Sequence, residues 1–484
     1  MTKKLMPPEK FLQSFQHDFG NDFLREYLSK FDESGERGLR VNTLKISPNE
    51  FEKISNLPLE KIEFFDGAYY LNTSNKLGNS VLHQAGAFYL QEPSSMIPVA
   101  SVQDLDFQNK TILDLCASPG GKSTQIACLM HGTGLLVSNE IDSKRAETLF
   151  SNIERLGITN AVILNETPQN LSKNLSNKFD MIFVDAPCSG EGMFRKDETA
   201  ILEWNENLKF YNHDRQLEIL LEANKMLKQN GILVYSTCTF NTLENETTVH
   251  EFSTGFGYEI LNVNTKIEPF THAGLPLFDN IDLTKTRHFF PFSSRGEGQY
   301  VAVLKKVCPN ENTSKIQKKP QSFSVISALT AEYKILSEFV SKTLQNFDLS
   351  NFNIVKIGQK YFLVNKNVEV NCFDRLKIKS LGVMFGEIIK NRFEPAHQFF
   401  KAYGEYFANK INIKSDSDIL KKYLKGEQLS LDEIMTSHDT LSTQIAGNAY
   451  GVIFASGVSL GGVKVVDNML KNHYPKGLRI NNII

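Results

Sequence analysis

The chain lacks the features that most quickly assign a protein to a class, beginning with long apolar runs. No segment approaches the roughly 20 apolar residues that cross a bilayer. The first residues, MTKKLMPPEKFLQSFQHDF, have neither the apolar centre nor the small-residue cleavage site of a secretory signal. These absences lead us to expect a cytoplasmic protein.

Cysteine is scarce and scattered. The six cysteines match neither a zinc pattern nor a disulfide framework, so we expect reduced thiols and no metal site. They are Cys116, Cys128, Cys188, Cys238, Cys308 and Cys372. We interpret Cys128, Cys308 and Cys372 as packing residues, since a lone cysteine is most often a small buried hydrophobe.

The chain also lacks a large excess of positive or negative residues. The formal net charge is −2, which argues against a protein that coats nucleic acid with bulk positive charge. A local basic stripe remains compatible with a nucleic-acid enzyme. The 484 residues predict two to four domains, because single cores rarely grow past about 250–300 residues.

From Thr111 onward, strand patterns alternate with helix patterns, which predicts a Rossmann-like α/β domain with a mostly parallel sheet. The expected strands are TILDL, LLVSNE, AVILN, DMIFVDAP, GILVYST, HFFPF and QYVAVLKK. The expected helices begin after Gly121, at Ser143 and at His213. A small α+β subdomain precedes this domain, and two small α+β modules follow the polar stretch CPNENTSKIQKKPQS. The predicted boundaries are 1–100, 101–307, a linker at 308–322, 323–410 and 411–484.

The segment CASPGGKST resembles a phosphate-binding turn but fails both common tests. A Walker A loop needs glycine where Cys116 stands, and the three glycines of a dinucleotide fingerprint are absent. A strand, a turn at Gly120 and Gly121, and a helix start remain, with Glu140 at the end of the next strand. Helix-start N–H groups favour a carboxylate, and an acid at this place binds ribose hydroxyls. This combination indicates S-adenosylmethionine, although a plain tight turn with a surface glutamate is the simpler alternative.

Two cysteines follow buried strands directly. Cys188 lies in FVDAPCSGEGMFRK and Cys238 in ILVYSTCTFNTLENE. Because parallel strands bring their carboxyl ends to one edge, where ligands bind in open α/β sheets, we expect both thiols in one cleft with the cofactor. Packing explains one such cysteine, but two at adjacent strand ends favour chemistry.

These blocks resemble the signature motifs of the NOL1/NOP2/Sun-type RNA cytosine-5 methyltransferases. CASPGGK, DAPCSGEGMFRK and STCTFNTLENE carry the resemblance, with RVNTLK and YLQEPSSMIP nearer the N-terminus. RFEPAH, YLKGE and KNHYPKGLR resemble the bacterial RsmF branch, which acts on small-subunit ribosomal RNA. The resemblance implies an RNA-binding N-terminal subdomain, a methyltransferase domain and a PUA-like C-terminal module.

The resemblance also implies roles for individual residues. Cys238 is the nucleophile that adds to cytosine C6, Cys188 assists product release, Asp185 holds the ring at N3 or N4, and Lys122 reaches toward the base and the thiolate. The expected S-adenosylmethionine contacts are Cys116, Ala117, Ser118, Pro119, Gly120, Gly121, Lys122, Glu140, Arg145 and Asp185. Relatives commonly carry an acid after the third strand for adenine; here Asn165, Glu166 and Thr167 stay as alternatives.

The expected RNA contacts fall in three places. Arg195 and Lys196 follow the Gly190–Gly192 turn, where phosphate contact competes with ordinary solvation. Arg40 lies in the RVNTLK block. The third group, a basic run with Tyr474 for stacking, consists of Lys464, Lys471, His473, Lys476 and Arg479. We expect a monomer whose partner is RNA.

Three other functions compete. Transfer RNA methylation uses the same chemistry. Amino-group methylation of a base or glutamine uses an Asn-Pro-Pro-aromatic loop, where this chain has DAPC. A non-catalytic RNA-binding assembly factor would not need both thiols.

Overall fold

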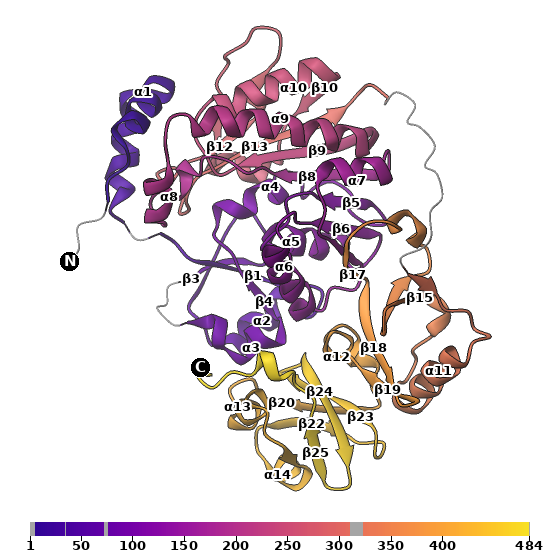
Figure 1. The fold of residues 1–484 in the computed structure, drawn as a ribbon. Coiled ribbons are helices and arrows are strands. Elements are labelled where there is room, and N and C mark those ends of the chain that lie inside the picture. The colour runs from indigo at the N-terminus through magenta and orange to yellow at the C-terminus, as the bar shows by residue number, and fades with distance from the viewer. Residues whose placement is uncertain (1–4, 34, 72–75, 310–322, 484) are drawn as a thin grey trace.

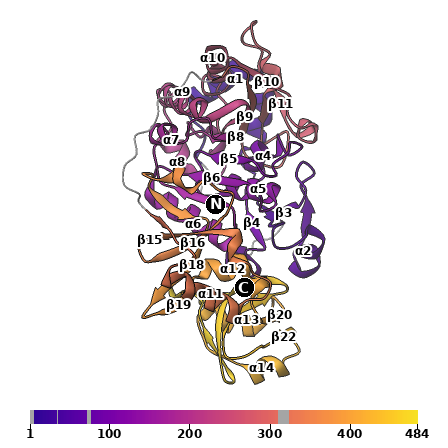
Figure 2. The ribbon, with the colours of Figure 1, turned by 90° about the vertical axis from the view of Figure 1, so that its right-hand side faces the viewer.

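A computed structural model describes residues 5–33, 35–71, 76–309 and 323–483. The linker expected at 308–322 lies outside the described residues except for its first two positions. A central α/β region lies beside the N-terminal segments, and the two C-terminal modules continue from its lower end (Figures 1 and 2). Among the described residues, every helix is too short or too polar to cross a membrane.

The N-terminal subdomain is a small antiparallel sheet with strand order β2-β3-β1-β4. Its elements are α1 (Glu9–Phe31), β1 (Gly38–Val41), α2 (Pro48–Ser55), β2 (Leu59–Lys61), β3 (Ala68–Leu71), α3 (Val81–Ala85), β4 (Phe88–Leu90) and α4 (Ile97–Ala100). Helix α1 lies apart from this sheet (Figure 1). Its Phe11 and Phe15 pack in one aromatic cluster with Phe194 and Phe240 of the central domain. The first helix therefore supports the loops that follow the cysteine strands.

The central domain has a parallel core with strand order β9-β8-β5-β6-β7. Its elements are β5 (Thr111–Asp114), α5 (Gly121–Met130), β6 (Leu135–Asn139), α6 (Ser143–Leu156), β7 (Ala161–Leu164), α7 (Pro168–Asn174), β8 (Phe179–Asp185), α8 (Glu198–Glu203), α9 (Leu208–Met226) and β9 (Leu227–Thr237). Helix α6 begins at Ser143 as predicted because the Asp142 side chain caps its first turn, and Gly157 ends it in a left-handed conformation. Helix α9 begins five residues before the predicted start at His213.

Antiparallel strands extend the parallel core on both sides. Helix α10 (Thr248–Phe256) leads to β10 (Tyr258–Leu261), β11 (His272–Ala273), β12 (Arg287–Phe289) and β13 (Gln299–Lys306). At the opposite edge, β17 (Ile378–Leu381) pairs with β7, with Leu381 opposite Val162. Strand β17 comes from the expected first C-terminal module. That module therefore covers an edge of the central sheet that would otherwise present unpaired backbone groups.

The C-terminal region contains two further sheets, ordered β14-β15-β16-β18-β19 and β21-β25-β24-β23-β20-β22. The first module contains β14 (Ser324–Val325), α11 (Ala331–Thr343), β15 (Phe352–Ile357), β16 (Lys360–Asn365), β18 (Val383–Ile389), β19 (Arg392–Pro395) and α12 (His397–Tyr403). The second contains β20 (Asn409–Ile413), α13 (Asp418–Lys425), β21 (Leu429–Ser430), α14 (Leu431–Thr436), β22 (Thr440–Gln444), β23 (Tyr450–Ala455), β24 (Val458–Val466) and β25 (Met469–Asn472). Strand β20 crosses the boundary predicted between residues 410 and 411. One apolar cluster joins Phe399 and Phe400 of α12 to Val452 and Phe454 of β23, so the modules share a core.

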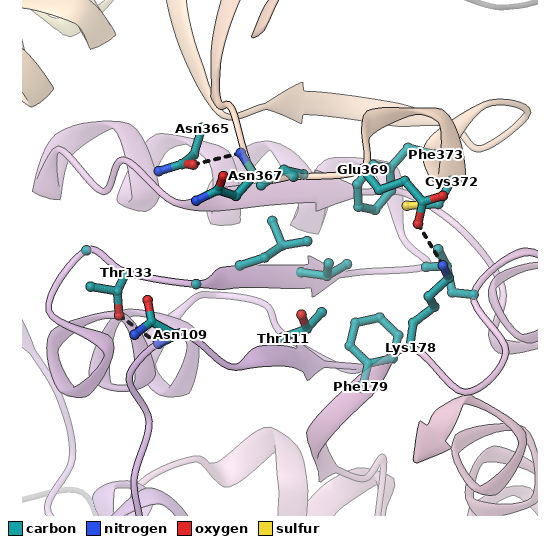
Figure 3. Close-up of a pocket in the computed structure, with 16 residues that line it drawn as sticks. Asn109, Thr111, Thr133, Lys178, Phe179, Asn365, Asn367, Glu369, Cys372 and Phe373 are labelled. Atoms are coloured by element: carbon teal, nitrogen blue, oxygen red, sulfur yellow. Dashed lines mark hydrogen bonds and ion pairs between the residues drawn. The ribbon is translucent and has the colours of Figure 1, made fainter. Parts of the chain in front are cut away.

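A cavity of about 410 Å³ lies between the central sheet and the first C-terminal module (Figure 3). Thr111 and Phe179 line it from the central sheet, and Phe373 from the module. The ion pair between Lys178 and Glu369, 2.8 Å long, bridges the two parts (Figure 3). Thr111 and Phe179 begin their strands, so this cavity lies at the amino ends of the sheet, opposite the edge where Cys188 and Cys238 lie.

Two lysines, the buried Lys401 and the half-buried Lys45, join the N-terminal subdomain to the C-terminal modules. The Lys401 ammonium on α12 donates to the carbonyl oxygens of Gln84, Ala85 and Ser459 at 2.8, 2.7 and 3.0 Å. The Lys45 ammonium donates to the Ala85 carbonyl and the Ser459 hydroxyl, both at 3.1 Å. Segments more than 300 residues apart are thus held at one polar junction.

Candidate active site

The two candidate thiols lie side by side at the carboxyl edge of the central sheet. Strands β8 and β9 are parallel neighbours, with Asp185 opposite Ser236, so their following loops begin together. The Sγ atoms of Cys188 and Cys238 are 3.3 Å apart, and the Cys238 N–H donates to the Cys188 sulfur at 3.3 Å. A group bound here can contact both sulfurs.

The loop that carries Cys188 depends on a glycine turn. Gly190 adopts a left-handed φ of +71°, which favours glycine. The Gly192 N–H donates to the Cys238 carbonyl at 2.9 Å, so this turn packs directly on the Cys238 backbone. The sequence GEG therefore ties the Cys188 loop to the end of β9.

A lysine–aspartate pair lies beside the thiols. The Lys122 ammonium, from the first turn of α5, is 2.6 Å from the Asp185 carboxylate, and the Ser236 hydroxyl donates to the other Asp185 oxygen at 2.8 Å. Burial alone would lower the pKa of Lys122, but Asp185, Asp114 and Cys238 together raise it above its ordinary value. Lys122 is therefore a fixed cation beside Asp185 and Cys238.

Two cavities adjoin this cluster. Their volumes are about 420 and 310 Å³, and both are lined by Cys116, Ser118, Asp185 and Cys238. The first also contains Glu140, Arg145, Arg215 and Cys188; the second also contains Tyr89, Gln91, Lys122, Lys196 and Gln299. Because Cys238 and Asp185 face both spaces, a donor in one cavity and an acceptor in the other would meet at these residues.

The two cavities together fit the ribose and carboxylate groups of S-adenosylmethionine, because Glu140 lines the first and Gly121, at the start of α5, lines the second. Helix α5 has no side-chain cap at Gly120, so its first N–H groups have no capping partner and suit a carboxylate. Glu140 directly follows β6 and is almost fully buried; one oxygen accepts the Asp142 N–H at 2.9 Å, and the other lies 3.4 Å from the Arg145 guanidinium. A buried acid held in this way is oriented for hydroxyl groups.

Most residues expected to bind the cofactor line one cavity or the other. Cys116, Ser118, Glu140, Arg145 and Asp185 line the first, and Ala117, Pro119, Gly121 and Lys122 line the second. Gly120 lines neither but supplies the left-handed turn, with φ of +111°.

The adenine alternatives Asn165, Glu166 and Thr167 are all engaged elsewhere. The Asn165 amide donates to the carbonyls of Glu140 and Ile141, Glu166 accepts the Lys377 N–H at 2.8 Å, and the Thr167 hydroxyl caps α7. The next residues, Pro168 and Gln169, line the cavity instead. None of the three is among the residues that line the cavity, and the choice of adenine contact among them stays a prediction.

Two of the residues expected to touch RNA are buried, and their assignment was wrong. Arg40 is 1% exposed and donates to the Thr124 hydroxyl at 2.6 Å and the Gly121 carbonyl at 3.4 Å. Arg195 is 8% exposed and lies 3.8 Å from the Glu297 carboxylate. Both arginines stabilise the site from inside: Arg40 anchors α5, which carries Lys122. Lys196, in contrast, is exposed and lines the second cavity.

The C-terminal basic run contains both exposed and buried side chains. Lys464 and Lys471 are directly opposite each other on β24 and β25, and Lys471, Lys476 and Arg479 are exposed. Tyr474 is 3% exposed and packs edge-on against Tyr423, so its predicted role in base stacking was wrong. Tyr474 is buried because its ring packs in the apolar core of the C-terminal module.

The three remaining cysteines differ in their exposure to solvent. Cys128 is buried and Cys372 half-buried, but Cys308 is exposed, so packing was the wrong interpretation for that residue. Within the described ranges, no group of three or more His, Cys, Asp or Glu side chains is arranged to hold a metal ion.

Sequence reasoning missed several lining residues. Arg215 and Ile219 reach the first cavity from α9, and Gln299 reaches the second from the start of β13. The helical i, i+4 spacing of Arg215 and Ile219 was a visible signal. Which face of α9 meets the strand ends, however, depends on how that helix packs.

Three segments of the chain match models of known protein families. Residues 103–305 match the model described as 16S rRNA methyltransferase RsmB/F, residues 7–93 the N-terminal domain of 16S rRNA methyltransferase RsmF, and residues 410–480 the methyltransferase RsmF PUA domain. The last match confirms the expected PUA-like module.

Solved structures show the same fold over part of the chain. A methyltransferase homolog protein from Pyrococcus horikoshii matches with a TM-score of 0.54 at 24% identity, over 62% of this chain and 95% of that one. NSun6 from the same organism with SFG gives 0.52 at 21%, over 62% and 98%. These likenesses confirm the Rossmann-like α/β fold.

Relatives match along nearly the whole chain. The ribosomal RNA small subunit methyltransferase F of Vibrio parahaemolyticus is 30% identical over 485 residues, covering 97% of each chain. The protein of the same name from Aeromonas salmonicida is 32% identical over 469 residues, covering 92% of each chain. With the thiol pair, the cofactor turn and all three domain types in place, the chain belongs to the ribosomal RNA small subunit methyltransferase F family.

Proposed function

We propose that the protein transfers a methyl group from S-adenosylmethionine to C5 of a cytosine in small-subunit ribosomal RNA, in the cytoplasm. The observation that carries the proposal is the pair of sulfurs 3.3 Å apart, next to the Lys122–Asp185 ion pair, where two cavities meet. Family membership supports the substrate class.

Cytosine C5 is a weak nucleophile and needs activation before it can accept a methyl group. The Cys238 thiolate adds to C6, which places electron density on C5 and divides one difficult step into easier ones. The buried Lys122 ammonium favours the thiolate over the thiol by its charge. Cys238 suits this role because it lines both cavities.

Asp185 orients the base. One of its oxygens is fixed by Lys122 and the other by the Ser236 hydroxyl. A carboxylate oxygen has more than one acceptor site, so Asp185 can also receive a hydrogen bond from the cytosine N4 amino group. This contact fixes the ring relative to Cys238.

The cofactor fits the adjoining cavities by its chemistry. When bound, S-adenosylmethionine supplies the electrophilic methyl group. The N–H groups of the first turn of α5 would hold its carboxylate, and Glu140 its ribose hydroxyls. Asp185 and Cys238 line both cavities, so a base held against these two residues would lie next to the cofactor.

Release requires loss of the C5 proton to a base and breakage of the C6–S bond, whose electron pair returns to Cys238. The Cys188 thiol, 3.3 Å from the departing sulfur, is placed to assist this step. A target cytosine stacked in a helix cannot enter the site, so it is flipped or unpaired. Lys196 at the second cavity and the basic run of the PUA module supply phosphate contacts.

Two substitutions test the mechanism. Cys238→Ala should abolish both methyl transfer and any covalent RNA adduct. Cys188→Ala should accumulate an adduct that survives denaturation, because the thioether forms but is not resolved. The adduct is measured as a slow protein band that disappears with ribonuclease. An active Cys238→Ala protein, or a Cys188→Ala protein without the band, contradicts the assigned roles.

The substrate is tested separately by bisulfite sequencing of total RNA from cells with and without the gene. A protected cytosine in small-subunit ribosomal RNA that disappears with the gene is expected. If the lost signal lies in transfer RNA instead, the chemistry remains but the substrate assignment is wrong.

A further inference from the structure

A buried carboxylate lies directly behind Cys188, and no step described so far uses it. Glu244 belongs to a π-helical turn (Leu243–Thr247) that follows Cys238, and it has no exposed surface. The Ser189 N–H donates to Glu244 at 3.0 Å and the Asn241 amide at 2.8 Å. Single π-type turns are rare and frequently occur at functional sites, and this one turns Glu244 toward the residue after Cys188.

Gln216, from α9, links Glu244 to the other side of Cys188. Its amide donates to the Pro187 carbonyl at 3.0 Å and to Glu244 at 2.9 Å. The peptide groups before and after Cys188 are therefore both held by the Gln216–Glu244 pair. This arrangement fixes Cys188 at the place where its sulfur meets Cys238.

The thiol pair lies between charges of opposite sign. Lys122 shares the second cavity with Cys238, whereas the Glu244 carboxylate is bonded to the residue next to Cys188. The hydrogen bond with Cys238, burial and the Glu244 charge all raise the pKa of Cys188 well above its ordinary value. Burial raises the pKa of Glu244 itself to about 7, so its charge is fully developed above that pH.

Other ionisable groups border the pair. Glu191 accepts the N–H groups of Phe240 and Asn241 at 3.1 and 3.0 Å, so it holds the segment after Cys238. The Tyr235 hydroxyl donates to the Glu244 carbonyl at 2.6 Å. Asp185 is bonded to Lys122. Of these acidic side chains, Glu244 is the one bonded to a neighbour of Cys188.

We propose that Glu244, held by Gln216, is a positioning residue that keeps the shared proton on Cys188, so that Cys238 carries the negative charge. The Cys188 S–H then donates to the Cys238 sulfur, the orientation that stabilises Cys238 as a departing thiolate. The assignment of steps to the two thiols depends on the proposed function. The location of the proton does not, and it is tested on the free protein.

Pulsed alkylation of the wild-type protein at pH 8 gives the first test. Iodoacetamide reacts with thiolates, so peptide mass spectrometry should show Cys238 labelled at least ~10-fold faster than Cys188, since one unit of pKa is tenfold in population. Faster labelling of Cys188 overturns the proposal. Neither RNA nor cofactor is present, so failure here leaves the methyl-transfer proposal open to its own tests.

Glu244→Gln, introduced into the Cys238→Ala protein, isolates the effect of the carboxylate charge on Cys188. We expect Cys188 to be labelled ~10-fold faster at pH 8 than in Cys238→Ala alone. The variant is sterically conservative, and the buried Gln216 Oε1, which has no hydrogen-bond partner among the described residues, can accept from the new amide.

Glu191→Gln in the same background is the matched control. It removes a buried carboxylate from the same network but from the side that holds Phe240 and Asn241. Cys188 labelling should then change less than ~2-fold. Two outcomes would overturn the proposal: equal effects of the two substitutions on Cys188 labelling, or no effect of Glu244→Gln in a protein that still melts cooperatively. Either would show that packing, and not the Glu244 charge, keeps the proton on Cys188. If Glu244→Gln does not fold, the wild-type labelling ratio decides alone.

Discussion

Gly192→Ala is the substitution that most directly tests whether the Cys188 loop sets the position of Cys238. A Cβ atom at Gly192 would lie 2.7 Å from the Gly298 Cα and 2.9 Å from the Cys238 carbonyl oxygen. Ordinary carbon contacts are roughly 3.5–4.0 Å. The backbone of Gly298, of Cys238 or of residue 192 itself must therefore move by about 0.8 Å. The three nearest atoms all belong to the backbone, so a change of side-chain rotamer cannot relieve the contact.

The displaced atoms include those that position Cys238, the proposed nucleophile. The Gly192 N–H bond to the Cys238 carbonyl, 2.9 Å long, would lengthen or break. Overpacking of this kind costs about 1–3 kcal/mol of folding free energy, which a protein of this size tolerates. A misplacement of ~1 Å at the reacting atoms lowers the rate ~100-fold. We therefore expect a folded enzyme with kcat/KM reduced ~100-fold.

The assay follows methyl transfer from radiolabelled S-adenosylmethionine to small-subunit RNA, with thermal unfolding measured on the same samples. Gly190→Ala is the matched control: no atom lies within 4 Å of its Cβ, but its φ is +71°. It should lose about 1 kcal/mol of stability through backbone strain and keep its activity within ~10-fold. If Gly192→Ala retains near wild-type kcat/KM, the loop does not fix Cys238, and the argument from close packing is refuted.

Three further outcomes are expected. Lys122→Met removes the cation beside Asp185. Adduct formation, measured on gels after quenching, should slow ~100-fold or more, as when another enzyme loses a group that stabilises charge in the transition state. An unchanged rate contradicts the role of Lys122. Lys471→Glu should weaken RNA binding and reduce the salt dependence by about one ion, whereas the same change at exposed Lys366 should leave both within ~2-fold. Burial lowers the pKa of Lys45 from 10.5 to about 7. Between these pH values the unfolded chain binds one more proton than the folded protein, so the stability of the fold increases as the pH rises through that range. Lys45→Met should reduce the increase in the urea unfolding midpoint between pH 7 and pH 9, and an equal increase in the variant and the wild type contradicts this prediction.

The polar junction and the shared core also decide how RNA binding by the C-terminal modules can be tested. Removal of residues 323–484 would delete β17 and expose the edge of β7. It would also remove Phe373 and Leu381 from the core of the central domain. Loss of RNA binding in such a truncation would therefore report damage to the catalytic domain, which is why a charge reversal at Lys471 is the better test.

The sequence by itself determined the local elements and the identity of the chemistry. Apolar runs bounded by glycine and polar turns placed β5 to β9 correctly, because a fully buried parallel strand needs a continuous apolar run. Since parallel strands end at one edge, Cys188 and Cys238 could be placed in one cleft before any coordinates were known. The CASPGGK turn likewise predicted a helix start after Gly120 and Gly121, with Glu140 at the end of the next strand.

Only the tertiary structure decided which charged residues are surface residues and which strands complete the sheet. Arginine is a typical RNA-binding residue, but Arg40 and Arg195 are buried. Thr124 and Gly121 accept hydrogen bonds from Arg40 inside the protein, and the Glu297 carboxylate lies beside Arg195. Strand β17 pairs with β7 across more than 200 residues, and no local pattern encodes such a partner. The same holds for Glu244 behind Cys188: helix α9 brings Gln216 to it, and that contact depends on packing between distant segments.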